Sequence, residues 1–155
     1  MAPETILNYL RACEDAYLFV KTRRLDVPGK KLLQVSEKYY MADHGLREAV
    51  YGNNERDIEL ISENMVCMEL LRRGYSVSVG KVGDREVDFV ADRGEERIYI
   101  QVCYLLAGED TIEREFGALA AIPDNFPKFV LSMDEVNKSR DGIEHRNLWE
   151  FLLDD

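Results

Sequence analysis

Three β-strand patterns follow one another closely in the middle of the chain, and they constrain its fold more than any other feature. Residues 75–81 (YSVSVGK) and 85–91 (REVDFVA) alternate in polarity, and residues 97–105 (RIYIQVCYL) are apolar enough for a central strand. Glycine-containing turns at residues 83–84 and 92–96 separate the three patterns. The middle of the chain therefore predicts closely connected strands of one sheet.

Helical patterns flank these strands. From residue 55 to 73, apolar side chains recur at spacings of three and four, and Gly74 suits the end of that helix. A second helix is predicted to start at Asp110, which could form a capping box with Glu113, and a fourth strand is predicted at residues 128–133. The element order α-β-β-β-α-β predicts an α/β fold with a mixed sheet.

The beginning of the chain reads as a helix followed by a β-hairpin. Residues 3–16 carry a helical apolar spacing, and the β-like stretches 16–24 and 31–41 flank an Asp-Val-Pro-Gly turn. Glycine and asparagine residues then interrupt the pattern. We therefore predict two parts, residues 1–42 and residues 43–155.

Length and charge limit the possible functions. A chain of 155 residues suits one domain with a small appendage. It holds 30 acidic and 20 basic residues, a formal net charge of −10. Residues 1–40 are mildly basic, with seven Lys and Arg against five Asp and Glu, so the excess acid lies in the remainder. This balance argues against binding nucleic acid by bulk charge, although it permits a local basic patch.

Cysteine and histidine usage indicates reduced thiols and no zinc site. Cys13, Cys67 and Cys103 are odd in number and widely spaced, as is typical of buried thiols in a cytoplasmic protein. His44 and His145 lie far apart, so there is no zinc pattern, and both are predicted as loop residues. The start of the chain does not resemble a signal peptide, and no apolar run has the length of a membrane helix.

Several familiar enzyme motifs are missing from the sequence. There is no Gly-x-x-x-x-Gly-Lys-Ser/Thr loop for nucleotide phosphates and no Gly-x-Gly-x-x-Gly dinucleotide fingerprint. A Gly-x-Ser-x-Gly nucleophile elbow is also absent. Within this chain, the sequence gives no support to ATP hydrolysis, dinucleotide binding or serine hydrolase chemistry.

One polar constellation remains on this frame. Glu86 and Asp88 are two apart on one predicted strand, and Gln101 and Cys103 are two apart on the next, so each pair is expected to share a face. Glu63 lies on the preceding helix at the edge of its buried side. A helix glutamate, a strand aspartate and a polar pair on the next strand form the layout of a metal-dependent nuclease, in which carboxylates hold Mg²⁺ against a phosphodiester.

The polar pair on the last of the three predicted strands departs from that layout. A nuclease of this type is expected to carry Glu at position 101 and Lys at position 103, whereas this chain has Gln101 and Cys103. Glutamine is a weaker ligand for a hard cation, and neutral cysteine cannot replace an ammonium group. The sequence therefore predicts a degenerate site in which acidic side chains remain without their compensating cation.

These residues resemble a known family. The element order with Glu63, Asp88 and Gln101 resembles the restriction-endonuclease-like, PD-(D/E)xK-type fold. More specifically, the chain resembles the C-terminal domain of unknown function of bacterial and archaeal AAA+-type ATPases. The phrases that carry the resemblance are EKYYMADHGLREAVYG (37–52), ENMVCMELLRRGY (63–75), REVDFVA (85–91), RIYIQVCYLL (97–106) and FVLSMDE (129–135). The resemblance implies that residues 1–42 are the remnant of a winged helix and that residues 43–155 form the nuclease-like domain.

Three functional hypotheses follow. The first is a non-catalytic nuclease-like module that acts in protein interaction or regulation, with the ATPase module of the same or a longer chain as its partner. The second is a Mg²⁺-dependent nuclease that uses Glu63, Asp88 and Gln101 as ligands, with Glu86 as a substitute. The third is a DNA-binding module that uses the basic residues of the hairpin. These residues are Lys21, Arg23, Arg24, Lys30 and Lys31.

Overall fold

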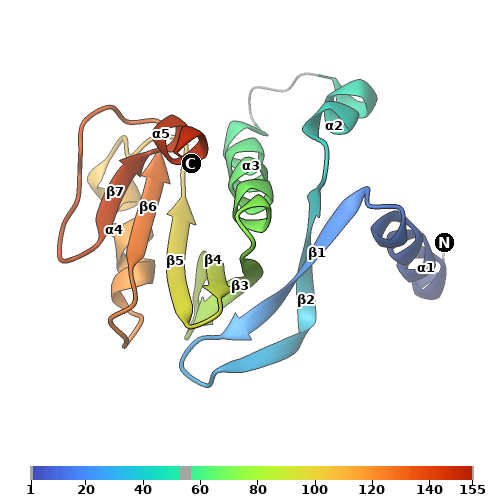
Figure 1. Cartoon of the computed structure of the whole chain (residues 1–155), viewed down its shortest axis with the longest axis horizontal. Helices are drawn as coiled ribbons and strands as arrows, with labels where there is room; N and C mark the ends of the chain where they lie inside the picture. Colours follow the sequence, from blue (N-terminus) through green and yellow to red (C-terminus); the bar gives the residue numbers. More distant parts are fainter. Residues whose placement is uncertain (1, 53–56, 155) are drawn as a thin grey trace.

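A seven-stranded mixed sheet organises the chain (Figure 1). The computed structural model describes residues 2–52 and 57–154, with the side chains of all of these except residues 34–36. The strands are β1 (Phe19–Asp26), β2 (Lys31–Met41), β3 (Ser76–Val82), β4 (Arg85–Arg93), β5 (Glu96–Val102), β6 (Lys128–Ser132) and β7 (Glu144–Asn147). The helices are α1 (Pro3–Asp15), α2 (His44–Tyr51), α3 (Ile58–Arg72), α4 (Glu109–Ala120) and α5 (Leu148–Leu153).

The strand order is β2-β1-β3-β4-β5-β6-β7. The tight turns make β3, β4 and β5 antiparallel neighbours, and β6 and β7 add in parallel beyond β5. The predicted α-β-β-β-α-β order is found as α3-β3-β4-β5-α4-β6, which confirms a mixed α/β fold.

The N-terminal hairpin is part of the same sheet. Strand β1 pairs with β2 in an antiparallel ladder and with β3 in a parallel one, where Arg23 faces Ser78 and Asp26 faces Lys81. The hairpin itself was predicted from the sequence, but its pairing with β3 was not. Because of this pairing, residues of β1 and β2 lie beside the central strands.

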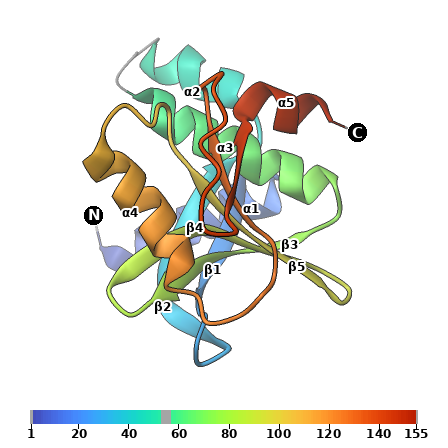
Figure 2. The same ribbon diagram turned by 90° about the vertical axis from the view of Figure 1, so that its left-hand side faces the viewer.

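Helices cover both faces of the sheet and create two apolar cores (Figure 2). On one face, Val66 and Leu70 of α3 and Phe151 of α5 pack against Phe89 and Ile100. On the other face, α4 packs with strands β4, β5 and β6 and with β1. The core therefore fixes the positions of α3 and of the strand ends beneath it.

Several local features differ from the expectations. Helix α2 and strand β7 were not predicted, because α2 has a glycine in its first turn and β7 is a four-residue strand whose position depends on pairing with β6. The predicted capping box of α4 is wrong, since its N-cap is Gly108, which has no side chain to accept a hydrogen bond. The predicted start of the long helix at residues 55 and 56 lies outside the described residues.

Candidate functional site

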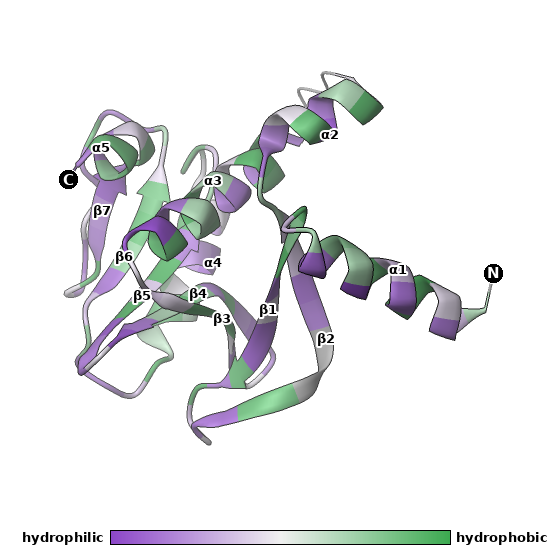
Figure 3. Cartoon of the chain, turned by 45° about the vertical axis from the view of Figure 1, so that its right-hand side comes forward, coloured by the Kyte–Doolittle hydropathy of each residue, from purple (hydrophilic) through white to green (hydrophobic). Residues whose placement is uncertain are grey.

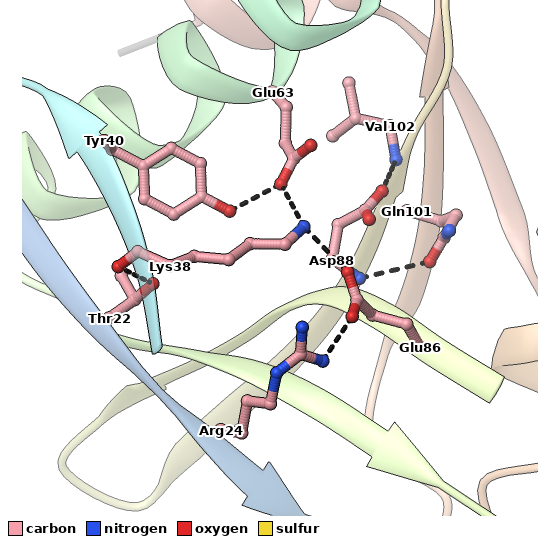
Figure 4. Close-up of polar contacts among 9 residues, drawn as sticks. All are labelled: Thr22, Arg24, Lys38, Tyr40, Glu63, Glu86, Asp88, Gln101 and Val102. Atoms are coloured by element: carbon pink, nitrogen blue, oxygen red, sulfur yellow. Dashed lines mark hydrogen bonds and ion pairs between the residues drawn. The ribbon is translucent and has the colours of Figure 1, made fainter. Parts of the chain in front are cut away.

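The predicted constellation converges at the end of the ladder between β4 and β5, below α3 (Figure 4). Backbone pairing of these strands stops at Phe89 and Ile100. Beyond that point, the Asp88 N–H donates to Oε1 of Gln101 at 3.2 Å, and the Val102 N–H donates to Oδ2 of Asp88 at 2.8 Å. The side chains of Asp88 and Gln101 therefore continue the ladder where its backbone bonds end.

A β-bulge lies at the same place. The register between β3 and β4 shifts, so that Asp88 and Phe89 together face the single residue Val79. Val87 consequently packs in the core beside α4, whereas Phe89 packs in the core beside α3, although the two residues are only two apart. The bulge is the local reason that Asp88 sits at the junction between the two faces.

Glu63 projects from α3 toward the hairpin. Its Oε1 accepts hydrogen bonds from the Lys38 ammonium at 2.8 Å and from the Tyr40 hydroxyl at 2.5 Å (Figure 4). Both donors come from β2. The neighbouring pair Met41 and Asn64 fixes this approach, because the Asn64 amide donates to the Met41 carbonyl and accepts from its N–H.

Lys38 also reaches the second carboxylate of the site. Its Nζ lies 2.7 Å from Oε1 of Glu86, and Arg24 forms a further ion pair with the other oxygen of Glu86. The expectation that the acidic residues lack a compensating cation is therefore wrong. Two cations are supplied by β1 and β2 instead of by position 103, because the hairpin joins the sheet next to β3.

The surroundings set the ionisation of these groups. Burial raises the pKa of Asp88 to about 8, and the nearby negative charge of Glu63 adds to the increase. Burial by itself would raise the pKa of Glu86, because it disfavours the charged form. Hydrogen bonds from Lys38 and Arg24 outweigh this effect and lower the pKa overall. The pKa of Lys38 is raised because its bonds to both glutamates outweigh its burial. Near pH 7 the site thus holds charged Glu86 and Lys38 beside a mostly protonated Asp88.

Cys103 takes no part in this network. Strand β5 ends at Val102, so Cys103 follows the strand and does not lie on it as predicted. Its side chain is buried in the core beside α4, and burial raises the pKa of its thiol to about 12. Cys67 is also a buried free thiol, as predicted, whereas Cys13, which was expected in the interior, is only partly buried.

The arrangement does not suit Mg²⁺. Among residues 2–52 and 57–154, no group of three or more His, Cys, Asp or Glu side chains is placed to hold a metal ion. The amide oxygen of Gln101 already accepts from the Asp88 N–H, and one oxygen of Glu63 accepts from Lys38 and Tyr40. The three proposed ligands, Glu63, Asp88 and Gln101, are therefore engaged in bonds within the protein.

The basic residues of the hairpin are divided among different environments. Lys21 pairs with Glu37 at 2.9 Å, and Arg24 points into the site toward Glu86. Arg23, Lys30 and Lys31 are exposed. The five residues named for DNA contact thus do not act as one equivalent basic surface.

A second polar network lies near the C-terminus and was missed by sequence reasoning. His145 is buried on β7, so its prediction as a loop residue is wrong. Its Nδ1 accepts from the Lys138 N–H, which assigns the ring proton to Nε2, 2.8 Å from the Ser132 hydroxyl. Ser132 in turn donates to Asp134.

This order of donors differs from that of a hydrolytic triad. In a triad the histidine accepts the serine proton, whereas here the histidine donates to Ser132 and the serine proton goes to Asp134. Burial lowers the pKa of His145 and keeps the ring neutral. The network therefore connects β6, β7 and the loop between them. The residues of this network do not follow a known sequence motif, so their spacing could not have predicted it.

Comparison with known proteins identifies a relative that is longer than this chain. No family model and no solved structure matches the chain. An uncharacterized protein of Haemophilus influenzae is 38% identical over 150 residues, a match that covers 96% of this chain and 37% of that protein. The chain thus spans little more than a third of the length of the relative that it matches.

Among the described helices, none has the length and apolar character needed to cross a membrane.

Proposed function

We propose that this chain is a non-catalytic, restriction-endonuclease-like module of an AAA+-type ATPase, and that it acts through contacts with protein. The observation that carries the proposal is the position of Lys38. Its ammonium group bridges Glu63 and Glu86, at 2.8 and 2.7 Å. An internal cation therefore lies between Glu63, one of the proposed metal ligands, and Glu86, the proposed substitute ligand.

The charge of the cluster supports this conclusion. Lys38 and Arg24 offset Glu63 and Glu86, and Asp88 is mostly neutral near pH 7 because its pKa is about 8. Mg²⁺ binds to ionised carboxylates and sheds its water reluctantly. A cluster with little net negative charge, in which one oxygen each of Glu63 and Asp88 already accepts hydrogen bonds, offers such an ion little free energy of binding.

The place of the module in a longer protein is supported by two observations. The sequence phrases listed above resemble the C-terminal domain of ATPases of this kind. The relative from Haemophilus influenzae extends well beyond the matched 37%, so it has room for a further domain of ordinary size. Both observations agree with a module that works beside another domain.

A DNA-binding role for the hairpin has weaker support. Two of its five basic residues, Lys21 and Arg24, are already paired with glutamates of the chain. The overall charge of −10 opposes approach to a phosphate backbone.

Calorimetric titration with Mg²⁺ and Mn²⁺, together with a DNA cleavage assay, tests the proposal. We expect no binding at millimolar ion and no cleavage by the natural protein. Lys38→Met should increase divalent-ion affinity, because it leaves Glu63 without its main counter-charge. Lys30→Met, at the exposed tip of the hairpin, is the matched control and should change neither the ion affinity nor the cleavage result.

A catalytic role for Lys38 predicts the opposite result. In that case the natural protein cleaves DNA with added metal, and both Lys38→Met and Asp88→Ala abolish cleavage. Observation of this pattern would end the proposal of a non-catalytic module.

A further inference from the structure

A small cavity between the end of β2, helix α2 and helix α3 contains buried polar atoms that have no partner. Its volume is about 270 Å³, and Figure 3 shows α2 directly after β2 at the margin of the molecule. Among the described residues, four buried side-chain nitrogen or oxygen atoms have no hydrogen-bond partner, and three of them belong to His44 and Arg47 of this cavity. Such atoms have lost water without gaining a partner, so three of them in one cavity favour a binding site there.

The start of α2 puts both side chains on one side of the helix. Asp43 caps α2, because its carboxylate accepts a hydrogen bond from the Gly45 N–H at 2.8 Å. His44, which was predicted as a loop residue, is therefore the first residue of this helix. Arg47 follows three positions later, and this spacing brings two side chains together on one helix face. Both of them line the cavity.

The other polar side chains of the cavity wall already have partners within the chain. They are Lys38, Tyr39, Tyr40, Glu63 and Asn64. Nη2 of Arg47 pairs with Asp57, which leaves its Nη1 without a bond. Nε2 of His44 lies 4.0 Å from Glu48, which is too far for a hydrogen bond. The groups with unused hydrogen-bonding capacity are therefore Nη1 of Arg47 and the imidazole ring of His44.

The imidazole ring can change the direction of its nitrogens without any movement of the helix. The His44 side chain is 24% exposed although both ring nitrogens are shielded from solvent, so its exposed surface belongs to carbon atoms. A half-turn about the Cβ–Cγ bond exchanges the positions of ring nitrogens and ring carbons, and this torsion is soft. The ring thus has a simple way to offer a hydrogen bond to a molecule in the cavity.

The charge around the cavity selects a ligand with a single negative charge. Guanidinium and imidazole N–H groups donate to carboxylate and phosphate oxygens. Three carboxylates of the chain already lie beside the cationic groups. They belong to Glu48, Asp57 and Glu63. These carboxylates repel a dianion more strongly than a monoanion, so a carboxylate is favoured over a phosphate.

The remaining wall is suited to a compact apolar group. Its apolar and aromatic side chains are Tyr39, Tyr40, Met41, Leu60 and Ile61. Pockets for drug-sized molecules have volumes of roughly 300–1,000 Å³, so this cavity fits a smaller ligand. We propose that it binds a small organic acid, with its one carboxylate held by His44 and Arg47 and its apolar part against these side chains. This binding goes beyond the proposed function and does not depend on it, because neither His44 nor Arg47 belongs to the cluster around Lys38.

Titration of the chain with benzoate, followed by NMR of the histidine rings, tests the proposal. Benzoate is a compact aromatic monoanion, and benzamide has nearly the same shape without the charge. We expect benzoate at millimolar concentration to shift the ring signals of His44 in a saturable manner. Those of His145 should stay unchanged, because that ring is buried in the network on β7. Benzamide and inorganic phosphate should bind more weakly by about tenfold or more. Equal affinity for benzamide, tighter binding of phosphate, or no saturable shift of the His44 ring overturns the proposal.

Two variants test which groups hold the carboxylate. His44→Leu removes the imidazole and Arg47→Met removes the guanidinium, and each should weaken benzoate binding in calorimetry by about tenfold or more. Arg11→Met, at an exposed position of α1, is the matched control and should bind benzoate as the natural chain does. Arg47→Met also breaks the ion pair with Asp57, so His44→Leu decides if that variant does not fold. Unchanged benzoate affinity in a folded His44→Leu variant overturns the proposal.

Discussion

The ammonium group of Lys38 lies 2.8 Å from a carboxylate oxygen of Glu63, and this contact joins the N-terminal hairpin to helix α3. Glu86 shares the same ammonium at 2.7 Å. One lysine thus connects β2, β4 and α3 at the point where the sheet carries its candidate site.

Lys38→Met should destabilise the protein by about 1–2 kcal/mol, because it leaves the largely buried Glu63 without its ion pair while Glu86 remains partly screened by solvent. The side chains of Lys38 and Glu63 are 28% and 14% exposed, which places the pair between a surface and a buried salt bridge. Urea unfolding at pH 7 measures the difference. Lys30→Met should stay within about 0.5 kcal/mol of the natural protein. An equally small change in Lys38→Met would show that the pair contributes nothing to stability.

Asp88→Asn should make the protein more stable than the natural one, by a margin that grows from pH 5 to pH 8 and vanishes below pH 3.8. The pKa of Asp88 is raised from 3.8 to about 8 in the folded state, so between these values the folded protein binds more protons than the unfolded chain. The stability that the protonated Asp88 carboxyl contributes is fully present below pH 3.8. It is lost as the pH rises from there through about 8, by at most about 1.4 kcal/mol per pH unit. Asparagine stays neutral and keeps an oxygen for the Val102 N–H.

Urea unfolding of both proteins at pH 5, 6.5 and 8 provides the measurement. A difference between them that is independent of pH would mean that Asp88 is ionised throughout this range. It would also remove one reason for excluding a divalent cation from the site.

Gln101→Leu should destabilise the protein by about 1 kcal/mol, because it removes the acceptor of a partly buried backbone N–H. That donor is the N–H of Asp88, 3.2 Å from the Gln101 oxygen. Amide hydrogen exchange at Asp88 should become faster in this variant. Gln101→Glu retains an acceptor oxygen, so the Asp88 amide should stay protected in it. Unchanged exchange in Gln101→Leu would mean that another group satisfies this N–H.

In the folded protein His145 should be mostly neutral at pH 6.5, with its proton on Nε2. Burial lowers its pKa from 6.5, so the unfolded chain takes up the proton first, and the stability that the neutral ring contributes is present above pH 6.5 and lost as the pH falls through the lower folded-state pKa. Nitrogen NMR of the ring reports both the tautomer and the pKa. Ser132 should not react with a fluorophosphonate, because its proton is donated to Asp134. Labelling of Ser132, or a pKa at or above 6.5, would contradict this description.

The central strands and their helices could be predicted because their signals are local. Alternation in residues 85–91 and the glycine turns give β3, β4 and β5, and the order of these strands brings Asp88 next to Gln101. Glu63 could be placed near them because it lies on the helix that directly precedes β3. The same reasoning failed for Cys103, since the ladder with β4 already stops at Ile100 and β5 ends at Val102, which alternation alone does not record.

The sequence by itself determined the hairpin, the central strands, the helices on either side, and the group of Glu63, Asp88 and Gln101, because each follows from spacing within a short stretch of chain. Only the tertiary structure decided how that group is neutralised. The parallel pairing of residues 23–26 with residues 78–81 joins segments more than fifty positions apart, and no periodicity records such a contact. This pairing places Lys38 and Arg24 beside Glu63 and Glu86, and so it converts an apparently uncompensated acidic site into a balanced ion-pair network.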